Sequence, residues 1–325
     1  MKKVVLSGMR PTGRLHLGHL VGGLENFLML QKKEEYQCYF FIADWHATTD
    51  TFDWSEINEY SREILLDWLA YGINPQKSII FRQSRIPEHS ELLVILSSIT
   101  PVPWLTRCPS YKDKLEMLKE EERVSIGFLN YPLLQTADII IYKANYVPVG
   151  EDQLPHLEIT REIIRRFHHR FNCSIFPEPT ALLTKIPRLP GLDGRKMSKS
   201  FGNTIDLAEN EESIKTKILS MITDPQRVKR SDCGHPEVCS VFEYHKVFFK
   251  DRIQIIEQDC KSAKIGCVEC KNELSCRLIN LLEPFRRIRK ENIDTESIFT
   301  NGEIKAKERA KTVLNEVKQT IKVGI

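Results

Sequence analysis

Short apolar runs and longer segments of helical periodicity alternate over the first part of the chain. The runs at 4–6, 37–43 and 78–81 are nearly continuous, as strands buried on both faces of a parallel sheet require. Residues 54–72 place apolar side chains at the spacing of an amphipathic helix, and a helical pattern also begins at Leu20. This order predicts the first half of a doubly wound α/β fold.

The pattern of hydrophobic and polar positions in the rest of the chain indicates an insertion and a second domain. Prolines interrupt the alternation over about 85–130, which we predict to be an inserted connective segment whose apolar positions, such as Val102 and Trp104, form either a subunit contact or local core. Beyond Asn203 the periodicity is helical, at about 209–221, 240–257, 267–291 and 303–322. We therefore predict a Rossmann-like α/β domain over 1–203 and an all-helical domain over 204–325.

Composition narrows the class of protein. The 325 residues are 41% hydrophobic and 28% charged, which is ordinary for a globular protein, and the net charge of +3 is too small to indicate nucleic acid by itself. No apolar run reaches the length of a membrane span, and the chain enters a strand without a signal-peptide pattern, so we expect a cytoplasmic protein. In that compartment nine cysteines favour a metal site over disulfides.

The first candidate site is the turn that follows the run at 4–6. Its glycines, Gly8 and Gly13, allow a tight turn, and such a turn before a helix is where α/β folds hold phosphate. Gly18 leaves room for a flat purine, while His16 and His19 are spaced to point to one face and donate to a triphosphate. The alternative is a surface turn capped by two histidines.

A second candidate site lies on a predicted apolar helix within 127–142. Tyr131, Gln135 and Asp138 are spaced at i, i+4 and i+7 and form one stripe. A buried carboxylate needs a partner, so Asp138 either accepts from a ligand or is satisfied by the backbone. His46, which follows the run at 37–43, is either a wall of the site or a structural residue.

Two further segments fit a nucleotide. The turn Gly150-Glu151-Asp152-Gln153 follows a short apolar run and is suited to grip a ribose. The segment Lys196-Met197-Ser198-Lys199-Ser200 lies between glycines, and its two ammonium groups can neutralise charge that grows on a leaving pyrophosphate. A solvated basic loop is the alternative.

These motifs, in this order, resemble those of class I aminoacyl-tRNA synthetases. The opening at 7–13, the segment 131–138 and the turn at 147–153 are similar to the bacterial-type tryptophanyl-tRNA synthetases, over essentially the whole chain. The resemblance implies that Asp138 accepts the indole N–H, with Tyr131, Gln135 and Gln153 as further tryptophan-binding candidates. It also implies an ATP site made of Arg10, Pro11, Thr12, Gly18, His19, Gly150, Glu151, Asp152, Ile186, Lys196, Met197, Ser198, Lys199 and Ser200.

The implied reaction is activation of L-tryptophan. Its carboxylate attacks the α-phosphate of ATP, aided by Mg²⁺, and the aminoacyl group then passes to tRNA(Trp). His16, His19, Lys196 and Lys199 are the candidates for stabilising the transition state. Arg10 stands where many bacterial members have Gln, and Gln135 where they have Met, so the details of amino-acid binding depart from the family pattern. The alternatives are a tyrosyl enzyme, a small nucleotidyltransferase and a non-enzymatic paralogue.

The partners follow from the same resemblance. It implies a homodimer that binds tRNA(Trp), without a membrane or DNA partner. The basic clusters at 227–230 and 286–290 are either solvated faces or phosphate contacts for the anticodon region.

The cysteines of the helical region form a possible metal site. Cys239, Cys260, Cys267 and Cys270 have the spacing C-x20-C-x6-C-x2-C. Such a set fits a [4Fe–4S] cluster, which some similar synthetases carry on a slightly longer first spacer, a zinc ion, or reduced thiols without metal. Cys233 or Cys276 is an alternative fourth ligand.

Overall fold

One parallel β-sheet organises the structure. The computed structural model describes residues 2–49, 53–109, 111–112, 115, 125–183 and 189–324, and it describes only the backbone of Ser200. Within these residues the sheet has the order β3-β2-β1-β4-β5, which is the doubly wound order, and the predicted fold class is confirmed. The strands are β1 (Lys3–Met9), β2 (Tyr36–Ile42), β3 (Ser78–Arg82), β4 (Tyr146–Val149) and β5 (Thr180–Leu183).

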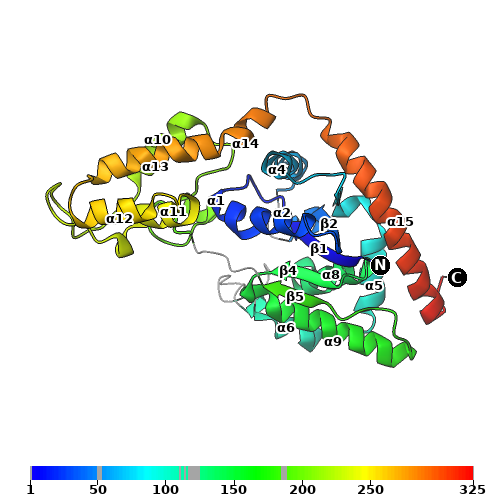
Figure 1. Cartoon of the computed structure of the whole chain (residues 1–325). Coiled ribbons are helices and arrows are strands. Elements are labelled where there is room, and N and C mark those ends of the chain that lie inside the picture. Colours follow the sequence, from blue (N-terminus) through cyan, green and yellow to red (C-terminus); the bar gives the residue numbers. More distant parts are fainter. Residues whose placement is uncertain are drawn as a thin grey trace.

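Alternating side chains of the central strands divide between two cores. In β2, Tyr39 and Phe41 face one core, while Phe40 and Ile42 face the other. This period of two is a property of the extended backbone, so near-continuous apolar strands fill both faces. Figure 1 shows α2 (Glu25–Gln31) and α4 (Ile57–Tyr71) on one side of the sheet and α9 (Leu154–Phe171) on the other.

The other helices surround the sheet or extend from it. They are α1 (Leu17–His19), α3 (Asp44–Ala47), α5 (Glu88–Ser97), α6 (Val102–Thr106), α8 (Ile126–Ile141), α10 (Glu211–Ser220), α11 (Ser240–Phe248), α12 (Ile253–Lys261), α13 (Cys267–Leu281), α14 (Glu283–Ile288) and α15 (Thr295–Ile321). Short π or 3₁₀ segments are η1 (Leu20–Leu24), η2 (Gln83–Arg85), η4 (Glu151–Gln153), η5 (Lys199–Phe201) and η6 (Pro236–Val238). In the described residues, no helix is long and apolar enough to cross a membrane.

The predicted insertion is partly integrated into the fold. Helix α5 packs against α8, and Leu96, Ile99 and Leu105 are buried in the core beneath the sheet. By contrast Val94 and Val102 are exposed. The apolar residues of this segment are therefore mostly local core, and α8 already begins before residue 130.

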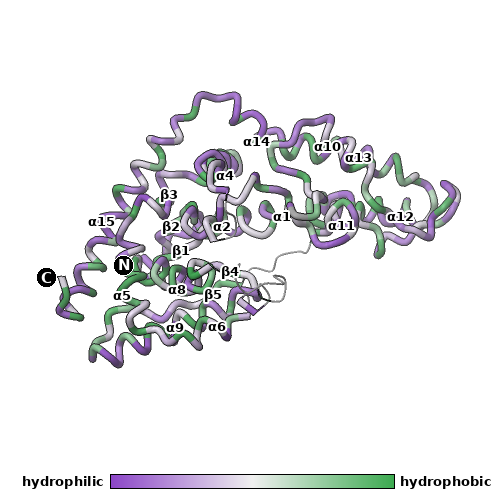
Figure 2. Tube along the Cα trace, turned by 180° about the vertical axis from the view of Figure 1, so that it is seen from behind, coloured by the Kyte–Doolittle hydropathy of each residue, from purple (hydrophilic) through white to green (hydrophobic). Residues whose placement is uncertain are grey.

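The helical region has two parts. Helices α10 to α13 extend away from the sheet in Figure 1, whereas α15 returns and packs against β3 and α5. Hydrophobic and hydrophilic residues alternate along α15 in Figure 2, as a helix with one buried face requires. The predicted division at residue 203 does not describe α15, because periodicity predicts a buried face but not the partner that covers it.

Gly302 shows how closely α15 approaches the sheet. A methyl group at this position would lie 1.7 Å from the backbone oxygen of Ile80 in β3, so glycine is required by the close approach of the two backbones.

Candidate active site

The turn after β1 presents two histidines at the start of a helix. His16 is the N-cap of α1, and its Nδ1 accepts a hydrogen bond from the backbone N–H of Gly18 at 3.1 Å. The Nδ1 of His19 accepts from the backbone N–H of His16, also at 3.1 Å. A neutral ring whose Nδ1 accepts must carry its proton on Nε2, so both residues present an N–H donor there.

Both histidines are neutral at physiological pH. Burial lowers the pKa of His16 to about 4, and the ammonium of Lys199 acts in the same direction. Burial, followed by His16 and Lys199, lowers the pKa of His19 well below its ordinary value. The sequence spacing predicted that His16 and His19 point to one face, and their ring centroids lie 3.9 Å apart.

The lysine-rich loop packs directly onto this turn. A methyl group on Gly18 would lie 3.4 Å from Met197 Sδ, and one on Gly13, where φ is +125°, would lie 3.0 Å from Lys199 Nζ. Lys199 is half-buried, whereas Lys196 is exposed. The glycines thus leave space that the loop occupies, so the two motifs form one site.

Asn203 fixes the loop, and sequence reasoning missed it. This buried side chain accepts from the backbone N–H of Ser198 at 2.8 Å through Oδ1. Its Nδ2 donates to Asp193 at 2.7 Å and to the backbone oxygen of Lys196 at 3.1 Å. An asparagine shortly after a basic motif is the only sequence signal, and it does not specify these partners.

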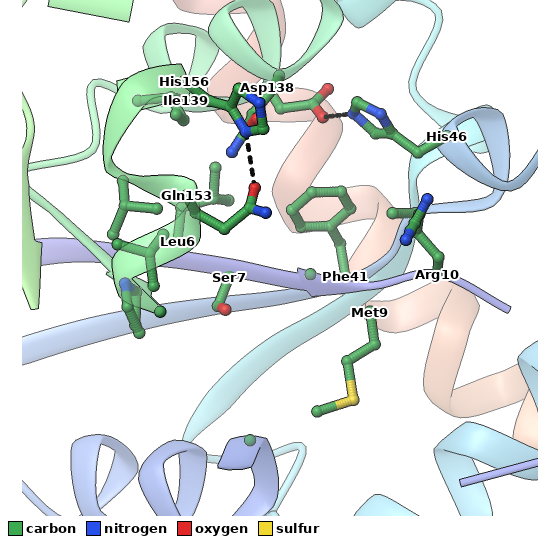
Figure 3. A pocket seen from close by; sticks show the side chains of 18 of the residues that line it. Leu6, Ser7, Met9, Arg10, Phe41, His46, Asp138, Ile139, Gln153 and His156 are labelled. Atoms are coloured by element: carbon green, nitrogen blue, oxygen red, sulfur yellow. Dashed lines mark hydrogen bonds and ion pairs between the residues drawn. The ribbon is translucent and has the colours of Figure 1, made fainter. Parts of the chain in front are cut away.

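A cavity of about 540 Å³ lies at the carboxyl ends of β1 and β4. In Figure 3, Arg10 and His46 lie on one side of it, and Gln153 and His156 on the other. The lining residues are Leu6, Ser7, Gly8, Met9, Arg10, Gly22, Gly23, Asn26, Phe27, Phe41, Ala43, His46, Thr49, Phe128, Tyr131, Gln135, Asp138, Ile139, Val147, Pro148, Val149, Gly150, Gln153 and His156.

Asp138 contributes the carboxylate of this cavity. It is 1% exposed, and its Oδ2 accepts from His46 Nε2 at 2.9 Å. Burial alone would raise the pKa of Asp138, but hydrogen bonds from His46 and His89 outweigh it and lower the pKa to about 2. His46 is therefore a wall of the site, and Asp138 is an ionised acceptor.

The predicted tryptophan-binding residues all line the cavity. Tyr131, Gln135, Asp138 and Gln153 are among its lining residues. His156, which was not predicted, connects two of them: its Nδ1 donates to Gln153 Oε1 at 2.8 Å, and its Nε2 accepts from the hydroxyl of Tyr131. Its polar neighbours become evident only when α8 and α9 pack together.

The predicted ATP-site residues are less uniformly placed. Arg10 and Gly150 line the cavity, whereas Glu151 and Asp152 are exposed in η4 and do not. Pro11 is buried and Thr12 exposed. Ile186 lies outside the described residues, as does the side chain of Ser200.

Four cysteines meet at a second, small cavity. Cys239, Cys260, Cys267 and Cys270 line about 20 Å³ of space together with Arg227, while Cys233 and Cys276 are exposed. Within the described residues, however, no group of three or more His, Cys, Asp or Glu side chains is arranged to hold a metal ion. The structure therefore brings the four predicted cysteines to one cavity, without the arrangement of a metal site in the described residues.

Two arginines of the basic cluster at 286–290 are bound by other parts of the protein. Arg286 donates to the backbone oxygen of Ile279 at 2.6 Å, and Arg289 Nε donates to Glu63 Oε2 at 2.9 Å. The guanidinium of Arg289 also forms an ion pair with Asp67 at 2.9 Å. Arg286 and Arg289 therefore have structural partners inside the protein, whereas Arg287 and Lys290 are exposed.

Comparison with known proteins identifies relatives along the full chain. Residues 2–283 match the family described as tRNA synthetases class I (W and Y). The tryptophan--tRNA ligase of Thermotoga maritima is 46% identical over 324 residues, covering 98% of each chain, and that of Aquifex aeolicus is 40% identical over 393 residues, covering 98% of this chain and 99% of that one.

Solved structures give the same result. Tryptophanyl-tRNA synthetase from Campylobacter jejuni, complexed with ADP and tryptophan, superposes with a TM-score of 0.89 at 32% identity, covering 98% of this chain and all of that one. A tyrosyl-tRNA synthetase from Archaeoglobus fulgidus, at 22% identity and a TM-score of 0.68, shares the fold.

Proposed function

This chain belongs to the tryptophanyl-tRNA synthetases, class I enzymes that join tryptophan to tRNA(Trp), and we propose that its 540 Å³ cavity binds the tryptophan that is activated. The observation that carries the proposal is the buried carboxylate of Asp138, held by hydrogen bonds from His46, Gln83 and His89, in a cavity with both apolar and polar walls. A carboxylate only accepts hydrogen bonds, so it is suited to the indole N–H.

The amino-acid end of the substrate lies toward the polar side of the cavity. Tyr131, Gln135 and Gln153 supply hydroxyl and amide groups for the α-amino group, and Arg10 supplies a positive charge for the carboxylate. The tryptophan carboxylate then attacks the α-phosphate of ATP, with pyrophosphate leaving. The reaction needs no protein nucleophile, so orientation and charge stabilisation account for the catalysis.

The nucleotide is held by the two joined motifs. The Nε2–H groups of His16 and His19 donate to phosphate oxygens, and Gly18 lets the purine approach the first helical turn. Lys199, next to Gly13, neutralises charge on the leaving pyrophosphate. Mg²⁺ bound with ATP would supply further charge neutralisation, and it would need few ligands from the protein.

ATP–pyrophosphate exchange tests this assignment with each amino acid in turn. We expect exchange with tryptophan and not with tyrosine, and greater exchange with tyrosine would refute it. Asp138→Asn should weaken tryptophan binding by about 1–3 kcal/mol through loss of a charge-assisted hydrogen bond. Glu158→Gln removes an exposed carboxylate on α9 and is the matched control, for which no change is expected.

We also propose a homodimer in the cytoplasm. The family resemblance implies the dimer, and Val94 on α5 and Val102 on α6, which are 65% and 58% exposed, are the residues that we place at the contact between the two copies. Sedimentation equilibrium should give twice the mass of one chain. Val94→Lys with Val102→Lys should shift the protein toward monomers, and a purely monomeric wild type would refute the dimer.

For the cysteine cavity we propose a [4Fe–4S] cluster, with a zinc ion or four reduced thiols as the alternatives. The support is that all four predicted thiols line one cavity. Four thiolates are the usual ligands of such a cluster. Arg227 Nη1, at 3.9 Å from Cys260 Sγ and 4.0 Å from Cys267 Sγ, would offset thiolate charge.

Anaerobic purification with analysis of iron, sulfide and zinc tests the cluster. About four irons per chain are expected. Cys267→Ser should abolish iron binding, whereas Cys233→Ser, at an exposed cysteine outside the cavity, should not. Metal-free protein prepared without air would refute the cluster and leave four reduced thiols.

A further inference from the structure

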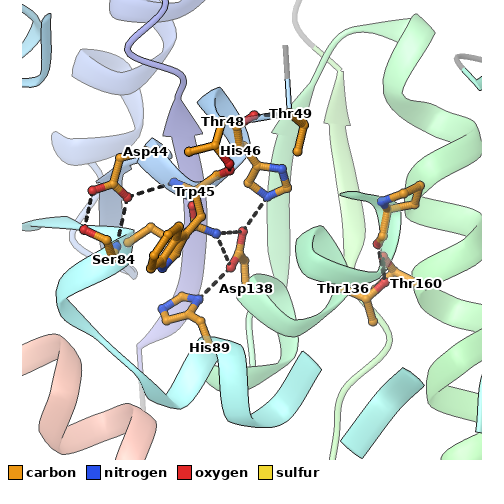
Figure 4. A network of polar contacts seen from close by, with 12 residues as sticks. Asp44, Trp45, His46, Thr48, Thr49, Ser84, His89, Thr136, Asp138 and Thr160 are labelled. Carbon is orange, nitrogen blue, oxygen red and sulfur yellow. Dashed lines mark hydrogen bonds and ion pairs between the residues drawn. The ribbon is translucent and has the colours of Figure 1, made fainter. Parts of the chain in front are cut away.

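The carboxylate of Asp138 is held by side chains from three separate elements. Its Oδ1 accepts from His89 Nδ1 of α5 at 2.6 Å and from Gln83 Nε2 of η2 at 2.8 Å. Its Oδ2 accepts from His46 Nε2 of α3 at 2.9 Å and again from Gln83 at 2.9 Å. Figure 4 shows His46 and His89 approaching Asp138 from different sides.

The partners of Asp138 differ in their access to substrate. His46 lines the cavity, whereas Gln83 and His89 do not and are 0% exposed. Behind His89 lies Tyr142, also fully buried, with its hydroxyl 2.8 Å from His89 Nε2. Asp138 therefore has one partner on the substrate side and a sealed polar network on the other.

The hydrogen bonds link Asp138 to Tyr142 through His89. An ionised carboxylate only accepts, so His89 Nδ1 carries the proton that it donates to Asp138. His89 Nε2 and the hydroxyl of Tyr142 form the next hydrogen bond, at 2.8 Å. Tyr142 thereby holds the far side of the ring whose near side contacts Asp138.

We propose that His89, held by Tyr142, is a positioning residue that keeps Asp138 an ionised and correctly oriented acceptor, and so sets the preference for a ring that carries an N–H. This inference rests on the proposed contact between Asp138 and the indole. Without His89, Oδ1 would be buried with one donor, and burial would favour the protonated carboxyl. A neutral acceptor binds an N–H about half as strongly as a charged one.

Comparing two substrates, with and without a ring N–H, distinguishes an effect of His89 on Asp138 from a general effect on folding. In 3-(benzothiophen-3-yl)alanine a sulfur atom replaces the ring N–H of tryptophan at similar size. Tryptophan-dependent and analogue-dependent pyrophosphate exchange give the ratio of the two kcat/KM values. A loss of packing changes both values together, whereas a loss at the carboxylate changes only the value for tryptophan.

Variants at His89 and Tyr142 test the network. His89→Leu should reduce the ratio about tenfold, or about 1.4 kcal/mol, by raising KM for tryptophan and leaving KM for ATP unchanged. Tyr142→Phe, which removes one oxygen, should reduce it less. His89→Asn keeps an N–H near the position of Nδ1 and should restore most of the preference.

Thr136→Val is the matched control. Thr136 is buried on the same helix as Asp138, and its hydroxyl donates to the backbone oxygen of Pro132 at 2.9 Å without contacting Asp138 in the described hydrogen bonds. This substitution should leave the ratio unchanged, whatever its effect on stability.

The outcomes separate the two proposals. A wild-type enzyme that does not prefer tryptophan over the analogue overturns the role of Asp138 itself. A wild type with the preference and a His89→Leu variant with the same ratio overturn the role of His89. If His89→Leu does not fold, Tyr142→Phe decides, because an unchanged ratio in that variant also overturns the inference.

Discussion

The two lysines of the 196–200 loop should contribute unequally to adenylate formation. Lys199 is half-buried against Gly13, and burial lowers its pKa, with Arg10 acting in the same direction and Asp206 opposing. Lys196 is exposed. Two unit charges 4 Å apart interact by about 4 kcal/mol at the effective dielectric near a protein surface but by about 1 kcal/mol in water. The same ammonium therefore stabilises developing phosphate charge more strongly at position 199.

Single-turnover adenylate formation measures this difference. Lys199→Ala should reduce the rate about 10²–10³-fold, the usual cost of removing one group aimed at developing charge. From the dielectric argument, Lys196→Ala should reduce it by less than about tenfold. Tryptophan affinity should be unchanged in both, since neither lysine lines the amino-acid cavity. Equal losses in the two variants would refute the reasoning.

The pH profile gives a second measurement at the same residue. Because the pKa of Lys199 is lowered, its ammonium loses the proton at a lower pH than a solvated lysine does. The kcat/KM for ATP should therefore decline on the alkaline side before a free lysine would titrate. Lys199→Arg keeps the charge and should remove this decline, and a decline that persists in the variant would assign it to another group.

Three further substitutions test the packing of the helical region. Gly302→Ala should destabilise the protein by about 1–3 kcal/mol through overpacking against β3, whereas Gly127→Ala, where the nearest atom would lie 3.5 Å away, should not, as urea unfolding can measure. Arg289→Met should cost about 3 kcal/mol by removing the ion pair of the buried Asp67, detected as a lower urea midpoint. Arg287→Glu should impair aminoacylation without affecting pyrophosphate exchange if this exposed residue contacts tRNA, whereas Arg286→Glu should impair both by destabilising the fold.

The pattern of hydrophobic and polar residues predicted the fold well, because each helix or strand carries this pattern within its own residues. The predicted helix at 54–72 is α4, and the apolar run at 37–43 is β2 within one residue. Helix breaks were missed: the predicted helix at 240–257 is two helices, α11 and α12, with a non-helical segment between them. The packing of α15 against β3 and α5 was also not predicted, because an amphipathic helix can pack its apolar face against any apolar surface.

The candidate site was predicted where its chemistry is local and missed where it is assembled from distant segments. Tyr131, Gln135 and Asp138 share one helix, so spacing alone places them together. His89 and Tyr142 are 53 residues apart, and His89 and Asp138 are 49 apart. Their contacts exist only because α5 packs against α8. Arg286 is the opposite case. Its positive charge made it a candidate for a phosphate contact, whereas its N–H groups donate to backbone oxygens of the protein itself.

Protons and charge are distributed differently at the nucleotide end and at the amino-acid end of the proposed site. Burial and Lys199 lower the pKa of His16 and His19, so in the proposed site they would orient phosphate oxygens through N–H donors without adding fixed charge. Positive charge comes instead from the loop that Asn203 holds against the glycines. At the other end, Asp138 accepts hydrogen bonds from His46, which lines the cavity, and from Gln83 and His89, which do not. We infer that the nucleotide end depends on the placement of one loop, whereas recognition of the ring depends on a network sealed inside the fold, so that substitutions at Asn203 should affect the rate and those at His89 the choice of amino acid.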